Sequence, residues 1–170
     1  MRVAGCIVLI FAAISACRER KEVVVPAPPT VVTDSVRVVS TIDTAVYYER
    51  TACFGMCPIF TCLILSDGSA VYEGRNFVDR IGQFQTNMDP TALQKIYQQC
   101  ESIDYFSLKP IYDHAHVTDL PSVITIIQVG EKKTKVVNRY KGPKALNDLY
   151  NALDTLIAQA KWVQMVEEKK

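Results

Sequence analysis

Short runs of β-favouring residues, separated by turns, dominate residues 44–140 and restrict the fold more than any other feature of the chain. Within residues 59–65, a Phe, a Cys and an Ile occupy alternate positions, which lie on one face of a strand. The pair Asp67-Gly68 follows directly, and Asp-Gly favours the type I′ turn of a β-hairpin. We therefore expect strands at 44–53, 59–65, 70–73, 83–88, 123–129 and 132–140.

Two further segments have the period of an amphipathic helix. The pair Asp89-Pro90 indicates the start of the first helix, because an aspartate can cap free N–H groups and proline is tolerated at the first helical position. The second follows Gly142-Pro143 and places leucines such as Leu149 and Leu153 on one face. The resulting order, ββββ-α-ββ-α, predicts an α+β domain: an antiparallel sheet with two helices packed on one face. Residues 104–121 show no period and are expected to form a long irregular loop.

The N-terminus has the pattern of a targeting segment. Arg2 precedes an uncharged apolar run that is too short to span a bilayer comfortably. The run ends in Ile14-Ser15-Ala16-Cys17, which resembles the lipobox of bacterial lipoproteins. That resemblance implies cleavage before Cys17, a thioether-linked diacylglycerol on its sulfur and further acylation, such as palmitate, on its amino group. The alternatives are a plain secretory signal with an incidental cysteine, and an uncleaved anchor.

The net charge bears on possible partners, and the residue after Cys17 bears on the location of the protein. Without Arg2 the mature chain keeps 18 basic and 18 acidic side chains, which gives no support for a nucleic-acid partner. Arg18 stands where Gram-negative lipoproteins retained in the inner membrane commonly have an aspartate. The resemblance therefore implies an outer-membrane protein, lipid-anchored and facing the periplasm or the cell surface. The bilayer would be its partner through Cys17.

Composition divides the chain into four parts. Proline and valine dominate the stretch before residue 44, which opposes a helix and is typical of an extended tether. The expected parts are a signal peptide at 1–16, a lipidated N-terminus and tether at 17–43, one α+β domain at 44–162 and a charged tail at 163–170.

Four cysteines remain beyond the targeting segment, and an even number in an oxidising compartment suggests disulfides. Cys53 and Cys57 flank a short turn that can bring them together. Cys62 and Cys100 both lie on expected core faces. Three pairings are possible, and we favour Cys53–Cys57 with Cys62–Cys100.

The hexapeptide Cys53-Phe54-Gly55-Met56-Cys57-Pro58, followed by Asp67-Gly68, resembles the hallmark of an uncharacterised family of bacterial envelope domains. The resemblance covers about residues 44–160. It implies a domain of unknown function and brings no activity with it. Cys62 and Cys100 are not part of the hallmark.

Two groups of residues could carry chemistry. Cys53 and Cys57 have the spacing C-x-x-x-C and lead into a strand, whereas redox enzymes of the thioredoxin type place C-x-x-C at a helix N-terminus. We interpret them as a structural turn or bridge. His114 and His116 are the only histidines, and an H-x-H pair binds zinc or copper when a third ligand, such as Asp113 or Asp119, is added. No firm third ligand is visible in the sequence, so we interpret the two histidines as solvated loop residues and keep a metal site as the alternative.

The spacing of residues reveals no catalytic triad and no paired carboxylates, so we expect neither an enzyme nor a cofactor. The function we predict is that of a membrane-anchored envelope lipoprotein whose domain binds a ligand or an envelope protein, or supports an assembly. Two alternatives stay open: a thiol-redox or metal-handling periplasmic protein, and a periplasmic enzyme inhibitor.

Overall fold

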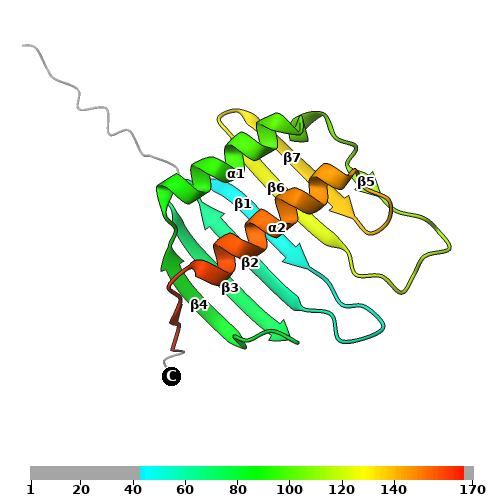
Figure 1. Cartoon of the computed structure of the whole chain (residues 1–170). Helices are drawn as coiled ribbons and strands as arrows, with labels where there is room; N and C mark the ends of the chain where they lie inside the picture. The colour runs from blue at the N-terminus through cyan, green and yellow to red at the C-terminus, as the bar shows by residue number, and fades with distance from the viewer. Residues whose placement is uncertain (1–42, 167–170) are drawn as a thin grey trace, which may run out of the picture. The chain divides into compact units, whose positions relative to one another are not determined.

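A computed structural model describes residues 43–166 of the chain. The expected signal peptide, Cys17 and the tether lie outside the described residues. The described part contains an eight-stranded sheet, ordered β5-β7-β6-β1-β2-β3-β4-β8, with two helices on one of its faces (Figure 1). The elements are β1 Thr44–Arg50, β2 Ile59–Leu65, β3 Ser69–Asn76, β4 Gly82–Asn87, α1 Pro90–Ser102, the 3₁₀ helix η1 Tyr105–Ser107, β5 Ile111–Tyr112, β6 Val123–Val129, β7 Lys132–Asn138, α2 Lys144–Gln159 and β8 Val163–Gln164.

Six of the strands are those expected from the sequence, and these six pair antiparallel with one another. β2 and β3 are joined at Asp67-Gly68, and Gly68 has a φ of 86°, which a glycine adopts without strain. Along β2, the alternate residues Phe60, Cys62 and Ile64 are buried as predicted.

The prediction of a purely antiparallel sheet in the order ββββ-α-ββ-α is wrong at both edges. β5 lies in the stretch expected to be irregular and pairs parallel with β7, which makes the sheet mixed. β8 follows α2 and pairs antiparallel with β4. Each strand has two residues, too few to show a period in the sequence. They pair because the chain passes an open sheet edge; Val137 N–H, for example, donates to Pro110 O at 2.9 Å.

Both helices begin where the sequence predicts. The side chain of Asp89 accepts a hydrogen bond from Thr91 N–H at 2.9 Å, and Pro90 opens α1. In α2, Leu149 and Leu153 are fully buried against the sheet, and Asn151 between them is exposed. Neither helix of residues 43–166 is long and apolar enough to cross a membrane.

The expected Cys62–Cys100 bridge is wrong, although both side chains are fully buried as predicted. Cys62 lies on β2. Cys100 lies near the end of α1, just before Tyr105, whose hydroxyl donates to Thr125 Oγ1 on β6 at 2.7 Å. β1 separates β2 from β6 in the sheet, so the two thiols occupy different parts of one core (Figure 1). Two cysteines that both face the core are therefore not necessarily joined by a disulfide.

Candidate functional site

Three loops leave the same end of the sheet. β1 ends at Arg50 opposite Val123, where β6 begins, and the start of β2 pairs with the end of β3. Residues 51–58, 77–81 and 113–122 therefore lie together at this end, which we call the loop end (Figure 1). Both groups of residues that the sequence singled out, the Cys53/Cys57 pair and the His114/His116 pair, lie there.

A disulfide joins Cys53 to Cys57, as predicted, with their Cα atoms 5.8 Å apart. The residues between them form a bend, and no helix begins at either cysteine. A helix N-terminus is what lowers the pKa of a thioredoxin-type thiol, so this feature of a redox site is missing here. The bridge closes a loop of five residues and restricts its backbone.

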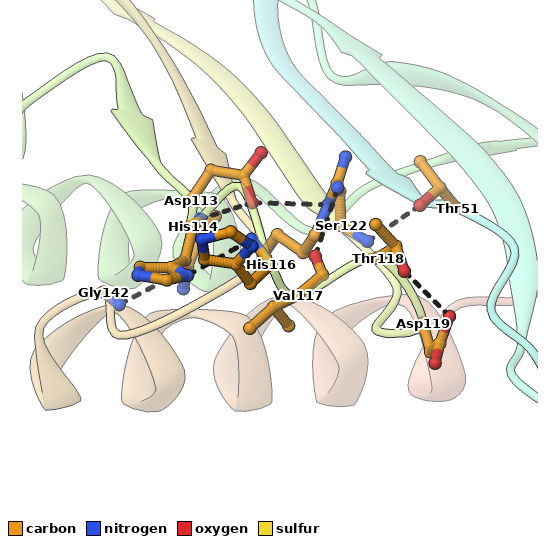
Figure 2. Close-up of polar contacts among 11 residues, drawn as sticks. Thr51, Asp113, His114, His116, Val117, Thr118, Asp119, Ser122 and Gly142 are labelled. Carbon is orange, nitrogen blue, oxygen red and sulfur yellow. Dashed lines mark hydrogen bonds and ion pairs between the residues drawn. The ribbon is translucent and has the colours of Figure 1, made fainter.

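Backbone contacts attach this disulfide loop to its neighbour. Thr51 N–H donates to Ser122 O at 3.0 Å, and Ser122 N–H donates back to Thr51 Oγ1 at 2.8 Å. Phe54 N–H donates to Asp119 O at 3.4 Å. The carboxylate of Asp119 accepts from the Thr118 hydroxyl at 3.0 Å (Figure 2). The disulfide loop is therefore fixed at its base as well as closed by its bridge.

Large apolar side chains project from the loop end. Phe54 is 94% exposed and Met56 is 83% exposed, both inside the disulfide loop. Phe77 and Ile81 from the second loop and Leu120 from the third are also exposed. These five make up half of the large exposed apolar residues in the described part of the chain. All five lie in loops at one end of the sheet and stay exposed after folding.

An ion pair lies behind the disulfide loop and joins β1 to α2. Arg50 pairs with Asp154, with its Nε donating to Asp154 Oδ1 at 3.2 Å, and the Tyr48 hydroxyl donates to the same oxygen at 2.8 Å. Burial opposes the charge of Arg50, but its contacts with Asp154 and Tyr48 outweigh that effect and raise its pKa. Burial also raises the pKa of Tyr48. These groups hold one another in place and support the loop end.

The two histidines lie on the third loop with their ring centroids 5.4 Å apart. His116 N–H donates to His114 Nδ1 at 3.3 Å, and His114 lies against Tyr140. Asp113, the nearest carboxylate in sequence, pairs with Arg139 at 3.6 Å (Figure 2). Within residues 43–166, no group of three or more His, Cys, Asp or Glu side chains is arranged to hold a metal ion.

The remaining cysteines are unsuited to act as nucleophiles. Burial raises the pKa of the Cys62 thiol to about 12. Burial, together with the charge of Glu101, raises that of Cys100 to about 12 as well. A thiol with so high a pKa stays protonated at neutral pH, and the thiolate is the reactive form. Both are core residues.

A family model for a domain of unknown function (DUF6438) matches residues 44–157. The chain belongs to this family. The match begins at the first residue of β1 and ends within α2, so the DUF6438 region contains the whole loop end. Neither a curated protein nor a solved structure matches the chain. The expectation of a domain of unknown function is confirmed.

Sequence reasoning missed one part of the loop end and one contact that supports it. The first is the 77–81 loop, which is drawn tightly against β3: a Cβ on Gly74 would overlap the backbone oxygen of Arg80. Its sequence signal is the pair of glycines, Gly74 and Gly82, that bounds the loop. The second is the partner of Arg50, because Asp154 is 104 residues away and no local pattern links them.

Proposed function

We propose that this chain is a lipid-anchored protein of the bacterial outer membrane, whose DUF6438 domain binds another envelope protein through the loop end and performs no catalysis. The observation that carries the binding proposal is the exposure of Phe54 and Met56 within a loop closed by a disulfide. Support for the anchor comes from Ile14-Ser15-Ala16-Cys17 in the sequence.

A loop that is closed by a disulfide and held at its base by hydrogen bonds is well suited to binding. Association costs free energy when loops and side chains become ordered, and a loop that is already ordered avoids part of that cost. Phenylalanine supplies a large apolar area, and methionine adapts its shape to an irregular surface. The partner we infer therefore has an apolar recess that accepts Phe54 and Met56.

A lipid anchor on Cys17 would hold the domain to the membrane through the tether. One acyl chain binds a bilayer only weakly, whereas two or more give stable anchoring, at about 0.8 kcal/mol per buried CH₂ group. Cys17→Ser removes the acceptor sulfur, so the protein should be released from the membrane or stay unprocessed. A variant with unchanged size and detergent partitioning would contradict the anchor.

The binding proposal is tested by crosslinking in intact cells. A photoreactive amino acid at position 54 should capture one discrete protein. The same amino acid at Val163, which is 62% exposed on β8, is the matched control and should not capture it. The captured protein is then purified and its affinity measured. Phe54→Ser with Met56→Ser should abolish binding, and unchanged affinity would contradict the proposal.

A second candidate, an inhibitor of a periplasmic enzyme, is favoured by the same protruding loop. Such an inhibitor would place Phe54 in the cleft of its target enzyme. The two candidates differ in the captured partner. If the partner is an enzyme and the wild-type domain lowers its activity while the Phe54→Ser and Met56→Ser variant does not, the inhibitor function is correct. A partner without measurable enzymatic activity favours the assembly function.

A further inference from the structure

Within residues 43–166, both helices lie on one face of the sheet and leave the opposite face open (Figure 1). A row of neighbouring apolar side chains crosses this open face at mid-strand. Tyr47 on β1 lies between Ile126 on β6 and Leu63 on β2, and Val71 on β3 follows Leu63. All four alternate along their strands with residues buried on the helix side, and all four remain partly exposed. We call them the apolar row.

Polar side chains surround the apolar row. Lys135 on β7 continues it beyond Ile126. In the next row, Glu49 accepts a hydrogen bond from the Tyr47 hydroxyl at 2.7 Å, and Glu73 pairs with Arg75 at 3.2 Å. These two carboxylates therefore have partners within the chain. An apolar centre with a polar rim is the typical composition of a protein–protein interface.

The open face is large enough for a stable interface. The six neighbouring strands from β7 to β4 are spaced about 4.8 Å apart and are about 20 Å long, so they cover about 600 Å² in projection. Side chains raise the accessible area above this projected area. Standard protein–protein interfaces bury about 800 Å² on each partner. A second sheet of the same size therefore matches this face.

The side chains of the open face complement themselves about a two-fold axis that runs along the strands, between β1 and β2. This axis places Tyr47 against Leu63 of the second copy and Ile126 against Val71 of the second copy. Lys135 at one end of the row then lies opposite Gln85 at the other end. An axis across the strands would instead bring Lys135 of both copies together, and opposed like charges are costly in an interface.

The axis along the strands also agrees with the proposed lipid anchor, and this step rests on that proposal. Rotation about such an axis preserves strand direction, so β1 begins at the same end of the dimer in both copies. Both chains then enter their domains from one side, as two anchors in one membrane require. The two loop ends point to the other side.

We propose that the open face binds the open face of a second copy of this chain. The two sheets pack about 10 Å apart in a two-fold dimer, with their apolar rows in contact. The dimer presents two loop ends together, so a partner that is itself repeated binds it more tightly than it binds a single copy. The apolar row and the loop end consist of different residues, so dimer formation and partner binding can fail separately.

Photocrosslinking in intact cells tests the dimer on the full chain. A photoreactive amino acid at Val71, which is 39% exposed, should yield a product of twice the mass of the chain, joined near Ile126 of the second copy. Asn151, exposed on α2, is the matched control position and should yield none. Capture of a different protein or of lipid, or no capture, would overturn the proposal. A product joined to β3 of the second copy would overturn the axis along the strands.

Val71→Lys is the decisive variant because symmetry repeats its charge in both copies. It should weaken association at least about tenfold in sedimentation equilibrium of the full-length protein in detergent. Asn151→Lys introduces the same charge on α2 and should leave association unchanged. The melting temperature checks that each variant is folded. Chains that share a micelle by chance would stay together in both variants, so equal association of Val71→Lys and the wild type would overturn the dimer.

The same experiments distinguish this proposal from the binding of a partner at the loop end. Phe54→Ser with Met56→Ser should dimerise as the wild type does while losing its partner. A wild-type chain that is monomeric but still captures a partner from position 54 would contradict the dimer alone. A dimer that captures no partner would contradict the proposed function alone.

Discussion

The two cysteine pairs of the domain lie in opposite surroundings. Cys53 and Cys57 are bonded to each other in an exposed loop, where Phe54 between them is 94% exposed. Cys62, on β2, and Cys100, on α1, are fully buried in the core and are not bonded. The comparison shows two ways of fixing a chain segment. Where the side chains pack, burial is sufficient; where they do not, a covalent bridge and backbone hydrogen bonds take its place.

Because of this difference, we expect stability and the proposed binding to depend on different residues. The buried region contains the apolar side chains whose removal from water stabilises the fold. The loop end buries little of its own surface, so its side chains are free to contact a partner. Changes in the core should therefore lower the free energy of unfolding, whereas changes at the disulfide loop should lower only partner binding.

The largest effect is expected in the core. Leu149→Ala and Leu153→Ala each remove a fully buried side chain and should lower the free energy of unfolding by about 2–4 kcal/mol. Asn151→Ala, on the exposed side of the same helix, is the control and should change it by no more than about 0.5 kcal/mol. Urea unfolding measures all three. Equal losses would mean that the helix face is misassigned.

Alkaline pH should also lower the free energy of unfolding, through the two buried thiols. Cys62 and Cys100 have pKa values of about 12 in the folded protein, against about 8.5 for an unfolded thiol. As pH rises above 8.5 the unfolded chain loses these protons and the folded chain keeps them, so stability falls. The loss should reach about 1 kcal/mol for each thiol between pH 8 and 9.5.

Urea unfolding at several pH values measures this loss. Cys62→Ala and Cys100→Ala, singly and together, are the controls. Each substitution should remove one thiol's share of the pH dependence, independently of any loss of stability at neutral pH. A double variant with the same pH slope as the wild type would show that the buried thiols are not its source.

The ion pair at the boundary between the two regions should have an intermediate effect. Asp154→Ala leaves the partly buried Arg50 and the Tyr48 hydroxyl without their acceptor. It should lower the free energy of unfolding by about 1–3 kcal/mol. Glu73→Ala breaks the exposed pair with Arg75 and should cost no more than about 1 kcal/mol. Thermal or urea unfolding distinguishes them, and an equal effect of both would remove the support we assign to Asp154.

The smallest effect on stability is expected at the disulfide loop. Phe54→Ser with Met56→Ser replaces two exposed side chains and should change the free energy of unfolding by no more than about 0.5 kcal/mol. A loss comparable to that of Leu149→Ala would show that these side chains are packed in solution. Binding and stability would then depend on the same residues.

Local patterns in the sequence predicted most of the fold. Strands such as β2 and the start of α1 at Asp89-Pro90 follow from residues that are adjacent or a few positions apart. The Cys53–Cys57 bridge was predictable for the same reason, since a short turn connects the two residues. β5 and β8 were not, because each has two residues and exists only through its neighbour at the sheet edge.

Contacts between distant residues set the limits of prediction at the candidate site. Periodicity placed Cys62 and Cys100 in the core correctly, but it carries no information about which core residues are neighbours. The meeting of three loops at one end depends on strand register, and the pairing of Arg50 with Asp154 depends on how α2 crosses the sheet. Neither follows from one segment alone.

The most direct test of the account is to open the disulfide loop without disturbing the core. Cys53→Ala with Cys57→Ala removes the bridge, which in the chain-entropy description of such a short loop is worth about 2 kcal/mol at most. We predict that this variant stays folded at 25 °C while crosslinking from position 54 to its partner falls several-fold. Undiminished crosslinking in the folded variant would contradict the claim that the closed loop is what binds.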